Sequence, residues 1–346
     1  MIIKKNWALY VGALALAASN ITFAMSQDHS ELKSNITNTQ TTAYINLGEN
    51  CSVAMIDLKT DQLLDTIQIN ADKKGCILES VVTPKRDRLY AIKANEHGVD
   101  QYVQVFDTKS HTRVNSILVS SSPIRMPLSN IVMQPNGSHV YVSSYGSSGN
   151  DTVWDIDTST QKASMIRMGK RSTPGQMVIS PDGNKLYIAT RGENSISIVD
   201  TMSDTVVGVI EHVDASKMVL SRDGKILYAS WADKLLAFDT ATNNKLWEKQ
   251  LPFEIGLSFA ISPDNQTLYA SSLNRAGFFA VNLETLAVNQ LLSTTNSLWG
   301  NAVTDDGKRI YVVDYDNGEM LAMNAATGEI RARVSSLGKP ETLYLY

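Results

Sequence analysis

The sequence predicts an all-β fold, a seven-bladed β-propeller whose blades each contain four antiparallel strands. A tyrosine-led strand recurs seven times, at Tyr44, Tyr90, Tyr141, Tyr187, Tyr228, Tyr269 and Tyr311. Successive tyrosines are 41 to 51 residues apart, a period typical of propeller blades. Six of these strands follow a turn rich in Pro, Asp, Asn and Gly. Because one blade cannot cover both faces of its sheet, the repeats must stack around an axis to bury a continuous core.

The clearest repeat surrounds Pro181 and Gly183. Pro181 presets φ for a tight turn, and Gly183 supplies the positive φ that closes it. The flanking segments alternate between apolar and polar side chains, or are rich in β-branched residues, as half-buried strands are. The four strands predicted for this blade are residues 177–179, 185–190, 195–199 and 205–210.

The other repeats follow the same plan. Their turns lie at Pro84, 134–137, 221–224, 262–264 and 304–307. Each third strand is predicted to end at an Asp or Asn, namely Asp57, Asp107, Asp157, Asp200, Asp239, Asn282 and Asn324. These side chains favour Asx-type turns, so their number is no sign of a catalytic carboxylate pair.

Two segments carry a resemblance to a known family. Residues 180–190, Ser-Pro-Asp-Gly-Asn-Lys-Leu-Tyr-Ile-Ala-Thr, and residues 264–271, Asp-Asn-Gln-Thr-Leu-Tyr-Ala-Ser, resemble the YVTN-repeat family of β-propellers. The resemblance extends over residues 42–346, and at the level of the repeat the chain is also similar to the large subunit of amine dehydrogenases. The Gly-His and Trp-Asp pairs of WD-repeat propellers do not recur. The resemblance implies a scaffold only, because functions within this fold diverge widely.

Closure of the propeller requires a strand from each end of the chain. Residues 339–346 align with residues 173–180, which include the innermost strand of their blade. The chain then stops, whereas the first repeat begins near Thr42 with a second strand. We therefore expect the C-terminal strand to complete the first blade. Residues 33–37 are the competing candidate for that strand.

The first 24 residues read as a secretory signal peptide. Lys4 and Lys5 precede an apolar run from Trp7 to Ala18, and small residues surround the expected cleavage after Ala24. An uncleaved membrane anchor is the alternative. Residues 25–41 read as a polar leader, and no later segment is long and apolar enough to span a membrane. The sequence thus predicts an exported protein, soluble after cleavage and resident in a bacterial periplasm, with secretion as the alternative.

The charge of the chain argues against a general attraction to nucleic acid. Loss of the signal peptide removes two lysines and no acids, which moves the formal net charge from −4 to −6. A mildly acidic protein has no global electrostatic attraction to phosphate backbones or anionic membranes.

The two cysteines, Cys51 and Cys76, are predicted to form a disulfide. Loops between blades and loops joining the second and third strands lie on one face of a propeller. Cys51 falls in a loop of the second kind, and Cys76 opens the innermost strand of the next blade. Export to an oxidising compartment favours the bond, and two separate thiols are the alternative.

Aligning the innermost strands reveals a position that is polar in six of seven blades. We call these residues the polar ring: Glu79, Asn130, Gln176, Lys217, Ser258, Gly300 and Thr342. We expect them to surround the mouth of the central channel, either as a polar ligand pocket with Glu79 and Lys217 as charged members, or simply as a channel wall. The same face is expected to carry exposed aromatic and arginine side chains on its loops: Trp299, Trp231, Tyr145, Arg191, Arg275 and Tyr315.

Familiar catalytic and cofactor motifs are missing from the sequence. It has no Gly-x-Ser-x-Gly elbow, phosphate-binding glycine loop or dinucleotide fingerprint. None of the five histidines has a second ligand at zinc-site spacing, although His97 and His212 fall on the ring's face, where they could share a metal or act as an acid–base pair. We therefore expect no cofactor and no structural metal.

Three functions remain after these exclusions. The first is a non-enzymatic, monomeric, exported propeller that binds a small molecule or an exported protein through the cysteine-bearing face. The second is a hydrolase or lyase of lactonase type that uses the channel mouth, with Glu79, Lys217 and His212 as its groups. The third is single-stranded nucleic-acid binding through Trp231, Trp299 and nearby arginines, which the net acidity opposes.

Overall fold

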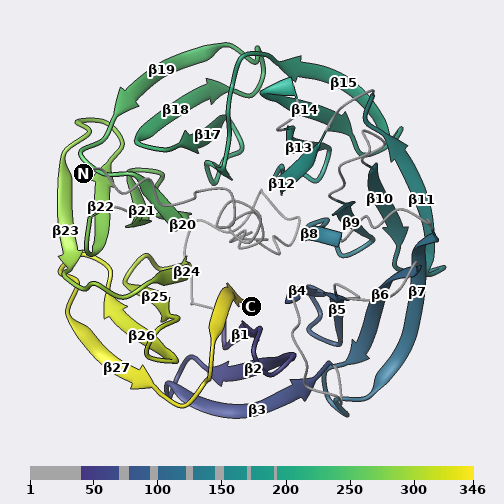
Figure 1. Ribbon diagram of the computed structural model, residues 1–346, viewed down its shortest axis with the longest axis horizontal. Helices are drawn as coiled ribbons and strands as arrows, with labels where there is room; N and C mark the ends of the chain where they lie inside the picture. Colours follow the sequence, from purple (N-terminus) through teal and green to yellow (C-terminus); the bar gives the residue numbers. More distant parts are fainter. Residues whose placement is uncertain are drawn as a thin grey trace, which may run out of the picture.

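Seven four-stranded antiparallel sheets surround a central axis, as the sequence predicts (Figure 1). The computed structural model describes residues 40–69, 78–93, 100–121, 128–144, 152–169, 173–190, 193–273 and 275–346. The predicted signal peptide, nearly all of the polar leader and the competing closing segment 33–37 lie outside these residues. Blade A contains β28, β1, β2 and β3, and blades B to G follow along the chain.

The inner half of each blade consists of its first and second strands. The innermost strands are β28 (Pro340–Leu345), β4 (Leu78–Val82), β8 (Leu128–Met133), β12 (Pro174–Ile179), β16 (Lys217–Leu220), β20 (Ile255–Ile261) and β24 (Leu298–Val303). The second strands are β1 (Thr42–Leu47), β5 (Arg88–Lys93), β9 (His139–Ser144), β13 (Lys185–Thr190), β17 (Ile226–Trp231), β21 (Thr267–Ser272) and β25 (Arg309–Asp314).

The outer half consists of the third and fourth strands. The third strands are β2 (Ser52–Asp57), β6 (Asp100–Asp107), β10 (Thr152–Asp157), β14 (Ser195–Asp200), β18 (Lys234–Asp239), β22 (Phe278–Asn282) and β26 (Glu319–Asn324). The outermost strands are β3 (Gln62–Gln68), β7 (Arg113–Ser121), β11 (Lys162–Arg167), β15 (Thr205–Ile210), β19 (Lys245–Gln250), β23 (Val288–Leu292) and β27 (Ile330–Val334).

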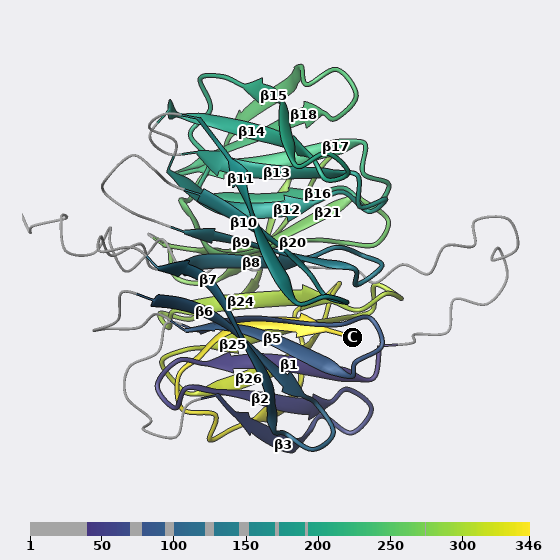
Figure 2. The ribbon, with the colours of Figure 1, turned by 90° about the vertical axis from the view of Figure 1, so that its right-hand side faces the viewer.

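The strands run between two faces at which the loops gather (Figure 2). The β1–β2 turn, which contains Cys51, lies beside the end of β3 and the start of β28. The amide of Ile69 donates to the carbonyl of Cys51 at 2.9 Å, and the amide of Gly48 donates to the carbonyl of Lys339 at 3.2 Å. We call this side of the molecule the cysteine-bearing face.

The repeated tyrosines join neighbouring blades. All seven are buried, none more than 5% exposed, in apolar clusters formed mainly by facing sheets. Two of them donate a hydrogen bond to the next blade: Tyr269 to the carbonyl of Ala325 at 3.2 Å, and Tyr311 to Asp61 at 3.0 Å. The period in the sequence therefore marks a residue that packs between neighbouring blades.

The strand-end acids act as turn residues, as the sequence predicts. Asp157 is typical, because its carboxylate accepts hydrogen bonds from the amides of Ser159 and Thr160 at 2.8 and 2.9 Å. Together with a bond from the Ser159 hydroxyl, these contacts lower the pKa of Asp157 to about 2. The same Asx turn follows β2, β6, β14, β18, β22 and β26.

One carboxyl pair was not anticipated from the sequence. Asp155 on β10 and Asp204 in the β14–β15 turn lie close enough across blades C and D for each carboxyl to shift the pKa of the other, and His139 Nδ1 lies 2.8 Å from Asp155 Oδ1. Burial and the charge of Asp155 raise the pKa of Asp204 to about 6. Protonation of Asp204 in mildly acidic solution therefore removes the repulsion between the two carboxylates.

The C-terminal strand closes the ring, which confirms the predicted completion of blade A. β28 pairs antiparallel with β1, with Tyr344 opposite Tyr44. Tyr344 and Tyr346 then reach into blade B: the Tyr344 hydroxyl donates to Glu79 at 2.9 Å, and the Tyr346 hydroxyl accepts from the amide of Val82 at 3.0 Å.

Deletion of residues 340–346 should destabilise the whole protein rather than one blade. The deletion exposes the edge of β1 and removes two buried tyrosines, a loss of more than about 5 kcal/mol. Thermal unfolding followed by circular dichroism should show a much lower or non-cooperative transition. Tyr346→Phe, the control, removes one hydrogen bond and should cost only about 1 kcal/mol. A truncated protein that melts cooperatively near the full-length value would contradict this role of β28.

Candidate ligand site at the channel mouth

The polar ring lies on the innermost strands, near their first residues. Its six polar members are at most 5% exposed, and Gly300 is buried as well. Glu79 lies on blade B and Lys217 on blade E, three blades apart around the axis. These side chains are therefore deeply seated rather than displayed on the surface.

Two ring amides connect neighbouring blades directly. Asn130 on blade C accepts a hydrogen bond from the amide of Met177 on blade D at 2.9 Å. Gln176 on blade D accepts from the amide of Met218 on blade E at 2.5 Å and donates to the carbonyl of the same residue at 3.2 Å. Each side chain thus satisfies main-chain groups of the next innermost strand.

The ring continues across the closure between blades A and B. Thr342 accepts from Asn46 at 2.5 Å, and Ser80 of blade B donates to the same Asn46 side chain at 2.5 Å. Ser258 instead bonds within its own blade, where its hydroxyl accepts from the amide of Ser271 at 3.1 Å.

Bulges in the innermost strands accompany these contacts. The pairing register shifts at the ring position in blades A, C, D, F and G, for example between Leu128 and Asn130 and between Leu298 and Gly300. A bulge redirects a side chain and frees main-chain groups from the ladder. The ring's hydrogen bonds indicate that it joins the blades, and ligand binding by its members remains a prediction.

Four of the six predicted surface residues lie within the described ranges: Trp231, Trp299, Arg275 and Tyr315. Trp231 ends β17 and is 44% exposed, whereas Trp299 is only partly exposed. Arg275 lies over the ring of Phe279, 5.1 Å from its centroid. Tyr145, Arg191 and His97 lie outside the described residues.

Four residues of blades A and G form a cluster on the cysteine-bearing face, which we call the mouth cluster. Trp299 on β24 stacks on Tyr315 of the β25–β26 loop, with ring centroids 4.3 Å apart. The Lys339 ammonium lies 4.6 Å from the centroid of the Tyr315 ring and donates to the Tyr315 carbonyl at 3.3 Å. Glu341, near the start of β28, completes the cluster.

Glu341 has the unusual environment in this cluster. Its carboxylate lies against the main chain of Gly48, where an added Cβ would be 2.1 Å from Oε1. It makes no hydrogen bond or ion pair with any other described residue. Burial without a compensating charge raises the pKa of Glu341 to about 8, so the group is largely protonated at neutral pH.

The surroundings of Glu341 are acidic. The pKa of Tyr315 is raised by burial first, and then by the negative charges of Glu341, Glu49 and Asp316. The cluster therefore combines a stacked aromatic pair with carboxylates, and such an arrangement attracts cations.

Glu341 could have been singled out from the alignment of the innermost strands, one position before the polar ring. Glu341 immediately precedes the ring position of its strand. The corresponding residues of the other six blades carry no charge: Leu78, Ser129, Gly175, Ser216, Leu257 and Trp299. Glu341 is thus the one charged residue at this aligned position, and blade A is the blade in which the repeat differs.

Metal binding has no support within the part of the chain that the structure describes. No group of three or more His, Cys, Asp or Glu side chains there is arranged to hold a metal ion. In the same ranges, no helix has the length and apolar character needed to cross a membrane.

Comparisons with known proteins identify the fold. No protein-family model matches the sequence, and no curated protein matches it. Among solved structures, the hydrazine synthase of Kuenenia stuttgartiensis superposes with a TM-score of 0.66 at 17% identity, covering 91% of this chain and 96% of that chain. A putative 6-phosphogluconolactonase from Bacteroides uniformis gives a TM-score of 0.65 at 16% identity, covering 89% and 99%. At such low identity, these similarities show the propeller fold alone.

Glu341→Gln should change how stability depends on pH. Because the folded-state pKa of Glu341 is raised from 4.5 to about 8, its contribution is fully present below pH 4.5 and is lost as pH rises through 8. The amide does not ionise, so the variant should gain stability over wild type between pH 5 and 9. We expect a gain of about 2 kcal/mol, less than the full pKa shift implies because the side chain is partly accessible.

Urea unfolding across that pH range measures this difference. The control is Glu329→Gln, which neutralises an exposed carboxyl on blade G. Parallel stability–pH curves for wild type and Glu341→Gln would show that Glu341 ionises normally.

Proposed function

We propose that this protein is a binding propeller that takes a small amine at the mouth cluster. The observation that carries the proposal is Glu341, a carboxyl that has no partner among the described residues and lies beside the stacked Trp299 and Tyr315. An ammonium group supplies the charge that Glu341 lacks, and an aromatic face stabilises the same cation. The fold supports this reading in general terms, because propellers present ligand sites on loops held by a rigid scaffold.

Lys339 provides an internal precedent for cation binding. Its ammonium already lies 4.6 Å from the centroid of the Tyr315 ring, on which Trp299 also stacks. A ligand cation would then lie between Trp299 and Glu341. Glu49 and Asp316 add negative potential to the same surface, which favours a cation over a neutral molecule of equal size.

Amine binding at this site involves a proton. Glu341 is mostly protonated at pH 7 and must ionise to pair with an ammonium group. Affinity should therefore rise about tenfold per pH unit below pH 8, and level off above it. Binding at neutral pH releases a proton from Glu341.

A second candidate function follows from the same carboxyl. A carboxylic acid that stays protonated at neutral pH is suited to general acid catalysis, as a hydrolase or lyase requires. The similarity to a putative lactonase is compatible with this function, but it reaches only the fold. Turnover of a lactone that depends on Glu341 would favour an enzyme over a binding protein.

Single-stranded nucleic acid is the third candidate. Trp231 is exposed enough to stack on a base, but acids such as Glu49, Asp316 and Asp233 lie on the same face. Phosphate backbones are repelled by such a surface.

We further propose that the protein is exported and that its repeats belong to the YVTN type. The support is the basic and apolar segment at residues 1–24 together with the repeat motif. A Cys51–Cys76 disulfide would suit that compartment. Cys51 is fully buried in the β1–β2 turn, and Cys76 lies outside the described residues.

Benzylamine should stabilise the mature protein, residues 25–346, in a thermal-shift assay, and benzyl alcohol should not. At about 100 times its dissociation constant, a ligand of the native state adds roughly 2.7 kcal/mol. Glu341→Gln should weaken benzylamine at least about tenfold and abolish the pH dependence of its affinity. Glu329→Gln should bind as wild type does.

Two other outcomes of the thermal-shift assay would count against the proposed amine site. Equal binding of the amine and the alcohol, or unchanged binding by Glu341→Gln, would overturn the proposed amine site. Stabilisation by oligo(dT) that fades steeply with salt would favour nucleic-acid binding instead.

The disulfide can be tested by mass spectrometry of protein exported from the intact precursor. We expect a mass two hydrogens below the dithiol form and no reaction with iodoacetamide until the denatured protein is reduced. Two alkylated cysteines without reductant would contradict the bond.

A further inference from the structure

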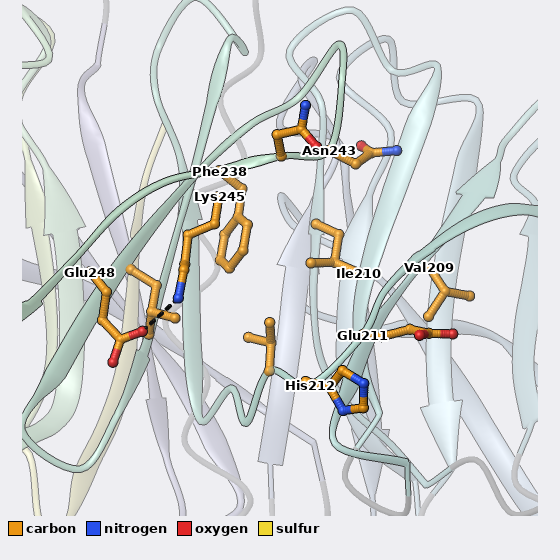
Figure 3. A pocket seen from close by; sticks show the side chains of 11 residues that line it. Val209, Ile210, Glu211, His212, Phe238, Asn243, Lys245 and Glu248 are labelled. Carbon is orange, nitrogen blue, oxygen red and sulfur yellow. Dashed lines mark hydrogen bonds and ion pairs between the residues drawn. The ribbon is translucent and has the colours of Figure 1, made fainter.

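A pocket of about 430 Å³ lies at the outer rim, between blades D and E. One wall is formed by the end of β15 and the loop that follows it, and the other by β18, β19 and their turn (Figure 3). Its volume falls within the usual range for small-molecule sites. We call it the rim pocket. It shares no residue with the mouth cluster on blades A and G.

The floor of the rim pocket is apolar. Ile210 and Val213 come from blade D, and Leu236 and Phe238 come from blade E; all four are less than 8% exposed. Val209 borders the opening and is 44% exposed. An apolar group of a few carbon atoms would cover this surface and gain burial energy.

The blade E wall carries a surplus cation. Glu248 forms ion pairs with two lysines, Lys245 at 2.8 Å and Lys234 at 3.0 Å. Only Lys245 lines the pocket. Lys234 and Lys245 together exceed the charge of Glu248 by one positive charge, so the Lys245 ammonium can also contact a ligand anion while it stays paired with Glu248.

The blade D wall carries a surplus anion. Glu211 is exposed and forms no hydrogen bond or ion pair with another described residue. His212 lies beside it, and the pair stands across the pocket from Lys245 and Glu248 (Figure 3). Asn243 Oδ1, on the blade E side, is a buried acceptor that no described residue donates to. The pocket thus has the Glu211 carboxylate, which has no partner among the described residues, on one wall and the Lys245 ammonium, which pairs with Glu248, on the other wall, above an apolar floor.

We propose that the rim pocket binds a small zwitterion with an apolar side chain, a free α-amino acid or dipeptide of the leucine or phenylalanine kind. The ligand ammonium pairs with Glu211, the ligand carboxylate pairs with Lys245, and the side chain covers the floor between them. Charges on both walls favour a ligand with two opposite charges over a neutral one. This inference does not depend on the function proposed for the mouth cluster.

Isothermal titration of the mature protein with L-leucine and L-phenylalanine tests the proposal, with their N-acetyl amides as neutral controls of equal side chain. We expect the free amino acids to bind and the blocked forms to lose at least about tenfold in affinity. Glu211→Gln and Lys245→Gln should each weaken binding about tenfold. Val209→Trp fills the opening from an exposed position and should abolish binding without lowering the melting temperature.

Two variants serve as controls, Lys308→Gln on a distant turn and Glu341→Gln in the mouth cluster, and both should bind as wild type does. Equal affinity for free and blocked amino acids would show that the pocket does not recognise the two charges, and would contradict the proposal. So would unchanged binding by Glu211→Gln and Lys245→Gln together. No heat of binding from either amino acid up to about 10 mM would rule out a site of useful affinity.

Discussion

The pairing of β28 with β1 is the constraint on which the rest of the structure depends. A ring of seven sheets leaves an open edge unless its first and last segments share a blade. Here the last residues of the chain become the innermost strand of blade A. The same strand places Tyr344 and Tyr346 against blade B, and Glu341 in the mouth cluster. The strand that closes the fold therefore also places a residue of the candidate site.

The fold uses many of its interior polar groups to join blades, whereas the Glu341 carboxyl has no partner among the described residues. Buried polar groups are costly unless they are paired, and ring members such as Asn130 and Gln176 find partners on the next blade. Glu341 differs, because its carboxyl has no partner within the described ranges and burial raises its pKa to about 8. Proteins tolerate such a departure chiefly where function requires it.

The repeat made the fold predictable, because each strand and turn is encoded within some twenty neighbouring residues and repeated seven times. Contacts between blades were much harder to predict from the sequence. Asp155 and Asp204 belong to different blades, and the sequence contains many other Asp residues in strand-end turns. The sequence pattern therefore gave no reason to pair these two. The mouth cluster likewise joins Trp299 to Glu341 through closure of the ring. The sequence alone predicted Trp299 as a surface residue, because it is an aromatic residue in a loop-face position. Glu341 could be recognised as a site residue only from the structure, which shows which carboxyl groups lack a partner among the described residues.

Hydrogen–deuterium exchange, resolved to a peptide covering residues 340–346, tests the role of β28 most directly. We expect its amides to exchange as slowly as those of β20 and β24, through global unfolding alone. Protection of that kind would mean that closure and the mouth cluster persist as long as the fold does. Rapid exchange of this peptide, with the other innermost strands still protected, would show that the ring opens locally and that β28 is not its closing constraint.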